Sequence, residues 1–218
     1  MAHKNNNNEL IRRYYSVNLE TREQNGVGII EGQPIVFNSL ADLGYFEEII
    51  MPGALDGTDL NDVRLCLNHD TSYVYARSRR NNPKSTMELN VVPDGMRIRA
   101  NLAIEDSPKA KDYFSAITRG DIDKMSFMFS IEEEEWERLD SDYPLRKITK
   151  IGSVVEVSAV TFPAYEATQI DARSKEALDS ARSALESARE QRNVDTVETE
   201  KNEELELLKQ KFIFKSKF

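Results

Sequence analysis

The feature that most restricts the fold of this chain is a series of short apolar or alternating runs between Leu10 and Ala167. Turn-forming residues separate the runs, which include VGIIEGQPIVF, FEEIIM, VRLCLN, STMELNVV, MRIRANLAI, MSFMFSI, LRKITKI and SVVEVSAVTF. Such runs are typical of antiparallel β structure. The clearest hairpin is MELNVVPDGMRIRANLAI, in which Pro93, Asp94 and Gly95 supply the turn.

One helix is predicted among the strands, in the segment DSPKAKDYFSAITRG. Ser107 is suited to the N-cap, Pro108 to the first helical position and Gly120 to the stop. The apolar face of this helix would consist of Tyr113, Phe114 and Ile117. Strands with one inserted helix indicate an α+β domain.

The two ends of the chain differ from this domain. Residues 1–9 are polar and rich in asparagine, so we expect a disordered leader. Residues 175–192 repeat alanine on one helical face among many charges, which predicts a solvated helix or weak coiled coil outside the core. The polar stretch NVDTVETEKN is expected to be a linker, and EELELLKQKFIFKSKF a docking peptide rather than a membrane-surface helix, because its apolar part is short.

Composition argues against several partners and cofactors. The net charge is −9 and no basic cluster alternates with aromatic residues, so nucleic acid is not an expected partner. The start of the chain lacks the apolar core of a signal peptide, and no run is long enough to cross a bilayer, so we expect a soluble protein made in a cytoplasm, with no membrane partner. Cys66 is the only cysteine, which excludes an internal disulfide and a cysteine-based metal cage; neither metal nor cofactor is expected.

Few residues could supply an imidazole or a thiol for catalysis. His3 lies in the polar leader, so a mechanism that needs a structured imidazole would use His69, at the end of the strand-like run VRLCLNHD. An ordinary strand-end histidine would give the same pattern. Cys66, in RLCLN, is either a nucleophile or a small core residue, and thiols in apolar runs are usually the latter.

Two polar residues interrupt apolar strands. In KMSFMFS, alternation separates Ser126 from the bulky face of its strand, so that its hydroxyl could line a groove next to Met128. Glu156 lies among valines in SVVEVSAVTFP; it needs a partner if the strand is interior, whereas an edge strand would turn it to water. Ser126, His69 and Glu156 could act as nucleophile, base and orienting acid, although each also has a purely structural explanation.

Several segments together resemble the prohead maturation proteases of tailed phages, of the type found with the Hong Kong phage capsid fold and related in architecture to herpesvirus assembly proteases. The resemblance covers roughly residues 27–170. The matching segments occur in family order and are GQPIVFNSLADLGYFEEIIMPGAL, RLCLNHD, ARSR, ITRGDIDKMSFMFS and VEVSAVTFPAY.

This resemblance implies a herpesvirus-protease-like fold, with an antiparallel β-barrel core, surrounding helices and a C-terminal helical tail. It implies a serine protease domain over residues 10–170 and a scaffold-binding, self-cleaved tail over residues 171–218. Carried over by position, His69 is the general base, Ser126 the nucleophile and Glu156 the third member of the site.

Two positions depart from the family pattern, and one further stretch could stabilise the oxyanion of the proposed reaction. The family usually has glycine where Met128 and Ala76 stand, and a larger side chain at 128 could narrow the substrate groove. The stretch around Arg77 is a candidate for the backbone N–H groups that stabilise the oxyanion, since the related proteases use an arginine-containing loop there.

The function implied by the resemblance is a serine endopeptidase of phage prohead maturation. Its substrates would be the scaffold-like part of the major capsid protein and the protease itself, inside the assembling procapsid in the host cytoplasm, and a homo-oligomer is compatible with this role. One alternative is a non-catalytic assembly module on the same fold, which a Ser126 buried away from His69 would favour. Another is a serine esterase or amidase for small molecules, which would need a concave pocket rather than a peptide-length groove.

Overall fold

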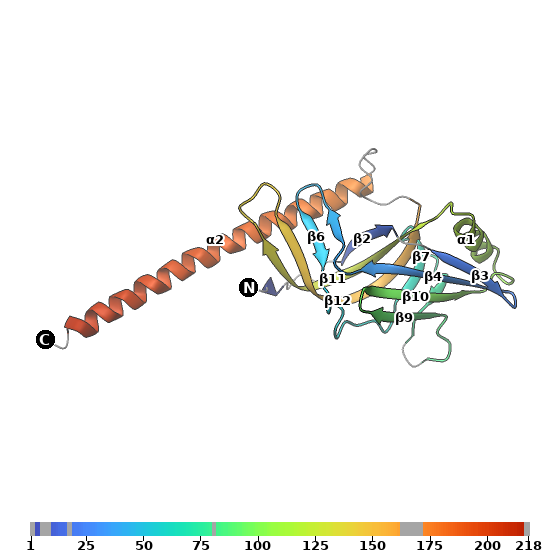
Figure 1. The fold of residues 1–218 in the computed structure, drawn as a ribbon, viewed down its shortest axis with the longest axis horizontal. Helices are drawn as coiled ribbons and strands as arrows, with labels where there is room; N and C mark the ends of the chain where they lie inside the picture. The colour runs from blue at the N-terminus through green and yellow to red at the C-terminus, as the bar shows by residue number, and fades with distance from the viewer. Residues whose placement is uncertain (1–2, 5–9, 17–18, 80–81, 162–171, 216–218) are drawn as a thin grey trace.

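The computed structural model describes residues 3–4, 10–16, 19–79, 82–161 and 172–215 (Figure 1). Its strands form two sheets. The larger sheet contains β1 (His3–Lys4), β2 (Leu10–Ser16), β5 (Leu40–Asp42), β6 (Glu47–Ile50), β7 (Arg64–Leu67), β8 (Ala76–Arg77), β11 (Lys124–Glu137) and β12 (Leu145–Val160). The smaller sheet has the order β3 (Glu20–Gln24), β4 (Val27–Val36), β10 (Gly95–Leu102) and β9 (Met87–Val92), with antiparallel neighbours throughout.

The hairpin expected around Pro93 and Asp94 is confirmed, because β9 and β10 pair directly across this turn. Gly95 has a φ of 149°, and a Cβ atom built on it would lie 1.9 Å from the carbonyl oxygen of Ile35. The turn therefore requires glycine, since any side chain would collide with β4.

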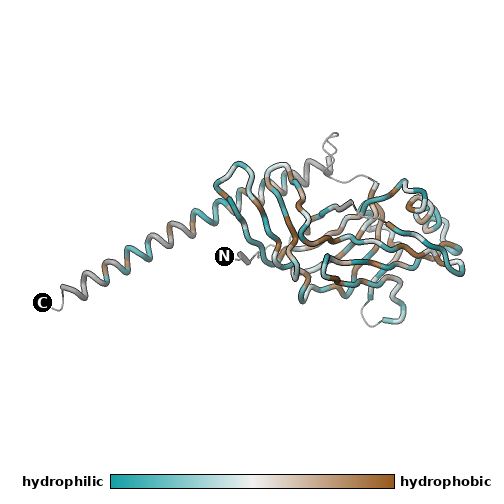
Figure 2. The backbone as a smooth tube through the Cα atoms, in the orientation of Figure 1, coloured by the Kyte–Doolittle hydropathy of each residue, from teal (hydrophilic) through white to brown (hydrophobic). Residues whose placement is uncertain are grey.

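The long strands β11 and β12 form the centre of the larger sheet. They pair antiparallel along most of their length; β2 pairs with the other edge of β11, and β7 pairs parallel to β12. Alternation along β11 turns Met125, Phe127 and Phe129 into the core, where all three are fully buried. Apolar residues occur along the strands of both sheets (Figure 2), and many of them form one buried core to which both sheets contribute.

The predicted helix is present as α1 (Pro108–Thr118). Ser107 caps it, with its Oγ accepting a hydrogen bond from the Ala110 backbone N–H at 3.2 Å. Ala110, Tyr113 and Ile117 are buried. The expected apolar face is thus confirmed in its main members, and Phe114 packs against the core from a half-buried position.

The expected barrel is not found among the described strands, whose pairings give two sheets and no closed barrel. The α+β class is confirmed, since the described residues contain more strand than helix and include two helices. Alternation of polar and apolar residues identifies strands and their buried faces, but barrel closure depends on pairing between edge strands far apart in sequence. The sequence pattern carries no signal for that pairing.

The C-terminal segment forms one helix, α2 (Ala172–Lys215), whose C-terminal part projects away from the sheets (Figure 1). The stretch 193–202, expected as a linker, is helical, and the whole of α2 lacks glycine and proline. Ala181 and Leu185 are buried against Leu43 and Phe46, so part of the alanine stripe packs on the sheet, contrary to the expectation of a solvated helix. No helix in the described residues is long and apolar enough to span a membrane.

The chain ends bear on the predicted domain boundaries. His3 and Lys4, within the expected disordered leader, pair as β1 with Glu134 and Glu133 of β11. The other leader residues lie outside those described. Residues 162–171, which contain the end of VEVSAVTFPAY and the predicted start of the tail, also lie outside.

Candidate functional site

Strands β11 and β12 bring three polar side chains onto one face of the larger sheet. Ser126 lies directly opposite Ser158, and Met128 directly opposite Glu156. Directly opposite residues in an antiparallel pair project to the same side, so Ser126, Ser158 and Glu156 share a face. The intervening pair of Phe127 and Val157 is buried on the core side.

His69 reaches the same face from the turn after β7. This strand pairs parallel to β12, with Cys66 beside Ser158 and Leu67 beside Ala159. Asn68 and His69 then adopt the left-handed conformation, with φ values of 52° and 61°. Residues other than glycine seldom adopt this conformation, and it sharply reverses the chain at the end of β7.

The Asn68 side chain holds this turn against β12. Its Oδ1 accepts hydrogen bonds from the Thr161 backbone N–H at 3.0 Å and from the Thr161 hydroxyl at 3.2 Å. The Asn68 backbone N–H donates to the Ala159 carbonyl at 3.0 Å. Asparagine tolerates the left-handed region better than most residues, which suits it to this position.

The three residues proposed from the sequence lie in hydrogen-bond contact. Ser126 Oγ is 2.6 Å from His69 Nε2, and His69 Nδ1 is 2.5 Å from Glu156 Oε2. Ser126 has no exposed surface, and the side chains of His69 and Glu156 are 7% and 2% exposed. A hydroxyl, an imidazole and a carboxylate in this order can generate an alkoxide nucleophile and hold the imidazolium that results.

Ser158 completes the polar cluster. Its hydroxyl donates a hydrogen bond to Glu156 Oε1 and accepts one from the His69 backbone N–H at 3.0 Å. The sequence predicted no role for this residue. Its position two residues after Glu156 in a strand was the available signal, because alternation places both side chains on one face.

Cys66 is buried in β7, and burial raises the pKa of its thiol to about 12, with the charges of Glu156 and Asp70 acting in the same direction. Only the thiolate is a strong nucleophile, and at neutral pH this residue stays protonated. The structure therefore favours the core role over the nucleophilic one. His3 is also distant from the site, because its partner Glu134 lies at the opposite end of β11 from Ser126.

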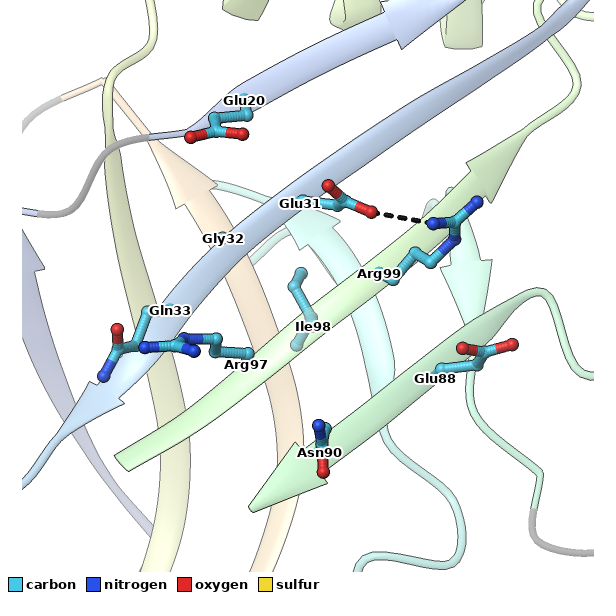
Figure 3. Close-up of a pocket in the computed structure, with 9 residues that line it drawn as sticks. All are labelled: Glu20, Glu31, Gly32, Gln33, Glu88, Asn90, Arg97, Ile98 and Arg99. Carbon is cyan, nitrogen blue, oxygen red and sulfur yellow. Dashed lines mark hydrogen bonds and ion pairs between the residues drawn. The ribbon is translucent and has the colours of Figure 1, made fainter. Parts of the chain in front are cut away.

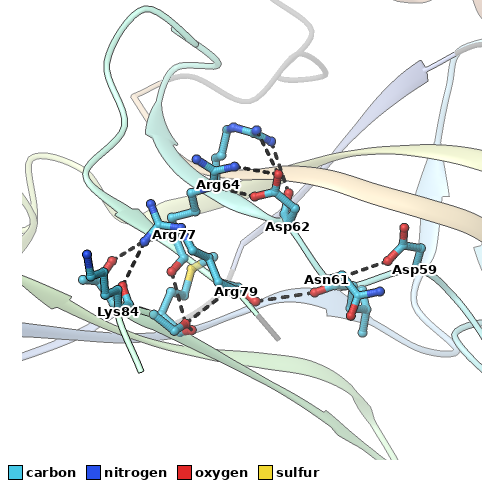
Figure 4. A network of polar contacts seen from close by, with 12 residues as sticks. Asp59, Asn61, Asp62, Arg64, Arg77, Arg79 and Lys84 are labelled. Atoms are coloured by element: carbon cyan, nitrogen blue, oxygen red, sulfur yellow. Dashed lines mark hydrogen bonds and ion pairs between the residues drawn. The ribbon is translucent and has the colours of Figure 1, made fainter. Parts of the chain in front are cut away.

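The stretch around Arg77 lies two strands away from Glu156, because Arg77 is paired with Arg64 and Arg64 with Glu156. Asp62 binds both arginines (Figure 4). The pKa of Asp62 lies below its usual range. The main cause is the hydrogen bonding from Arg77, and the charges of Arg64 and Arg77 add smaller effects in the same direction.

The backbone N–H groups of this stretch are already engaged. Those of Arg77, Ser78 and Arg79 donate to Thr86 Oγ1, the Val63 carbonyl and Ser85 Oγ at 2.9, 2.8 and 3.0 Å. They could serve as oxyanion donors only after these bonds were broken.

The structure also places the two residues that depart from the family pattern. Ala76 is buried in β8, and Met128 is half-buried beside Glu156.

The described surface has one recess near the proposed site and another on the smaller sheet. One, of about 520 Å³, opens beside His69 and is lined by Leu67, Asn68, His69, Asp70, Thr71, Tyr73 and Tyr75. The other, of about 580 Å³, lies on the smaller sheet, where Arg99 binds Glu31 at 2.9 Å (Figure 3). It contains none of the three proposed site residues. The described residues include no group of three or more His, Cys, Asp or Glu side chains that could hold a metal ion.

Comparison with protein families gives a match that spans most of the chain. The family described as caudovirus prohead serine protease matches residues 15–182, more than half of the chain. The chain belongs to the caudovirus prohead serine protease family. The proposed site residues Ser126, His69 and Glu156 all lie within the matched region, on β11, after β7 and on β12.

Comparison with solved structures finds the bacteriophage T4 capsid assembly protease, gp21. It is 12% identical to this prohead protease, with a TM-score of 0.42, and the match covers 71% of this chain and 98% of the T4 chain. No curated protein matches the sequence.

Proposed function

We propose that this protein is a serine endopeptidase of prohead maturation, with Ser126 as nucleophile, His69 as general base and Glu156 as the acid that orients the imidazole. The observation that carries the proposal is the continuous contact from Ser126 Oγ through His69 to Glu156, at 2.6 and 2.5 Å. Membership of a serine protease family supports the same reaction.

In the first half of the proposed reaction, Ser126 Oγ attacks the scissile carbonyl carbon while its proton passes to His69 Nε2. The resulting imidazolium is stabilised by Glu156 at Nδ1. Collapse of the tetrahedral intermediate breaks the C–N bond, and His69 returns the proton to the leaving amine. Water then attacks the acyl-enzyme with His69 again as base, which releases the acid product and restores the Ser126 hydroxyl.

The proposed substrates are the scaffold-like segment of the major capsid protein and the protease itself, within a procapsid in the host cytoplasm. The family description supports a role in the prohead. Under this proposal residues 10–170 form the protease domain and residues 171–218 bind scaffold until self-cleavage. Deletion of residues 175–218 should then reduce incorporation into proheads, and unchanged incorporation would remove this role from the tail.

A Ser126 buried away from His69 would favour the non-catalytic alternative. Ser126 is buried, but its Oγ contacts His69 Nε2. This contact supports the enzyme over the scaffold module. We include in this proposal a fold related to the herpesvirus assembly proteases and the formation of a homo-oligomer. Both rest on the family resemblance.

The decisive experiment is mass spectrometry of the wild type and of Ser126→Ala, each incubated alone and with its capsid protein. Discrete fragments that vanish in Ser126→Ala are expected. Ser130→Ala is the matched control, because Ser130 lies on the same strand and bonds Ser153 at 3.0 Å. Equal fragmentation of wild type and Ser126→Ala would exclude Ser126 as nucleophile, and intact masses in every sample would favour the scaffold module.

A further inference from the structure

The nucleophile proposed above has no exposed surface in this conformation. Ser126 is fully buried even though its Oγ faces His69. A peptide carbonyl has to come within about 3–3.5 Å of the attacking oxygen before reaction can occur. Some part of the protein must therefore move before a substrate can bind, and this requirement rests on the proposed function.

Strand β2 lies directly beside the nucleophile. Its register with β11 places Tyr14 opposite Ser126 and Arg12 opposite Met128. Tyr14 consequently projects to the same face as Ser126. Its ring meets the His69 ring edge-on, with centroids 5.7 Å apart and an interplanar angle of 88°.

The same strand occupies the position that an extended peptide would need. Peptides commonly bind proteases and other receptors by adding a strand to a sheet edge. At Ser126 both edges of β11 are already paired, with β12 on one side and β2 on the other. A substrate that pairs with β11 at Ser126 has to replace β2, since β12 carries Glu156.

Strand β2 is joined to the larger sheet through one ladder. Among the described residues it pairs only with β11, so its release breaks a single ladder. Arg13 of β2 also makes a bidentate contact with the buried Glu48, and this contact has to break when β2 leaves β11. A strand held by one ladder can open locally without global unfolding once such a contact is broken.

We propose that β2 is a built-in covering strand that occupies the substrate position along β11 and shields Ser126 with Tyr14. The site opens when β2 leaves β11, and a substrate strand then competes with residues 10–16 for the same edge. The prohead protease would thus be synthesised with its site closed.

Accessibility of position 126 tests this proposal without requiring activity. In a Ser126→Cys background, the alkylation rate of the new thiol by iodoacetamide is compared with and without Tyr14→Ala, and peptide mapping separates it from the buried Cys66. We expect at least tenfold faster alkylation after Tyr14→Ala. Tyr14→Phe is the matched control and should leave the rate unchanged, because it keeps the ring. Equal rates with Tyr14→Ala would overturn the proposal.

A disulfide lock tests the movement itself. Leu10 and Ser130 are paired across β2 and β11, at a separation suited to a disulfide. In the double variant Leu10→Cys/Ser130→Cys, oxidation should slow the labelling of Ser126 by a fluorophosphonate at least tenfold, and reduction should restore the rate. Equal labelling rates in the oxidised and reduced forms would overturn the proposal. Faster alkylation after Tyr14→Ala, combined with no labelling of Ser126 in any form, would support the covering strand and reject the proposed protease.

Discussion

At the residue scale, the site depends on a few side chains that each have two partners. Glu156 binds His69 through one carboxylate oxygen and Ser158 through the other. Ser158 in turn binds the His69 backbone, so the carboxylate and the imidazole are fixed relative to the same strand. This arrangement limits rotation of the imidazole about its side-chain bonds.

Replacing Glu156 with glutamine should lower kcat by a factor on the order of 10³ to 10⁴, because a neutral amide does not stabilise the imidazolium or fix its tautomer. Steady-state cleavage of the proposed substrate, the capsid protein, measures this effect. Glu132→Gln, which changes an exposed ion pair with Lys150, is the control. A loss below tenfold in Glu156→Gln would argue against its role as the third member.

Ser158→Ala should reduce kcat by roughly 10- to 100-fold, because removal of one hydrogen bond of about 1–3 kcal/mol leaves the His69 backbone N–H without its acceptor. KM should stay within about twofold, since Ser158 is a positioning residue. Restored activity in Ser158→Thr, which keeps the hydroxyl, would distinguish positioning from simple packing. An unchanged kcat in Ser158→Ala would contradict this prediction.

The three proposed site residues came from the family resemblance, and their individual patterns left structural explanations open. A buried glutamate among valines suggested a required partner, and the structure supplies two. Ser158 was missed because a serine in a strand has no distinctive pattern. The left-handed turn at Asn68 and His69 was also not predictable, since the residue types allow that conformation without requiring it.

At the element scale, a buried ion cluster joins β2, β6, β11 and β12. Glu48 accepts from Arg13 and Arg146, and Arg146 also binds Glu134. Burial alone would raise the pKa of Glu48, but the charges and hydrogen bonds of Arg13 and Arg146 outweigh it and hold the pKa below the ordinary value of 4.5. The cluster therefore stabilises the fold while Glu48 is ionised.

Glu48→Gln should lower the free energy of unfolding by about 3–5 kcal/mol at pH 7, because it leaves a buried guanidinium without its countercharge. A lowered folded-state pKa contributes stability above the unfolded pKa, which is lost as the pH falls through the folded value. Wild-type stability should thus decline below about pH 4.5, and more steeply than in the variant. Urea unfolding at several pH values measures both effects.

Glu31→Gln is the matched control for this cluster. Glu31 pairs with Arg99 and Arg22 on an exposed sheet face, so its loss should cost no more than about 1 kcal/mol. Equal destabilisation by Glu31→Gln and Glu48→Gln would show that burial of the cluster is unimportant.

The sequence predicted the strands better than their arrangement. The runs LRKITKI and SVVEVSAVTF correspond mainly to one strand, β12, and alternation in KMSFMFS gave the buried face of β11 correctly. The two-sheet arrangement was not predictable, because register and edge pairing depend on contacts between distant segments. The family resemblance suggested a barrel, and the described strands do not close one.

At the scale of the whole molecule, α2 is attached to the sheets by a small apolar contact. Leu185 and Ala181 pack with Phe46 and Leu43, and Trp136 lies at the edge of this cluster with its ring 4.8 Å from that of Phe46. Trp136 is the only tryptophan in the chain. Its fluorescence therefore reports on the docking of α2.

Leu185→Asp should shift the fluorescence emission of Trp136 to longer wavelength, because a carboxylate in the apolar contact would detach α2 and admit water. Leu205→Asp, on the exposed part of the same helix, should leave the spectrum unchanged. Identical spectra for Leu185→Asp and the wild type would mean that α2 does not depend on this contact.

The length of α2 has a geometric consequence. Arg189 bonds the Leu139 and Ser141 carbonyls, and Arg192 bonds Asp140, so α2 contacts the domain as far as residue 192. The part beyond, residues 193–215, contains no glycine or proline and extends roughly 35 Å at about 1.5 Å per residue. A stiff spacer fixes the distance at which a tethered enzyme meets its targets, whereas a flexible spacer lets that distance vary. If the end of α2 binds the scaffold as proposed, the peptide bonds cut first would be those roughly 35 Å from the point of attachment, the length of this projecting part.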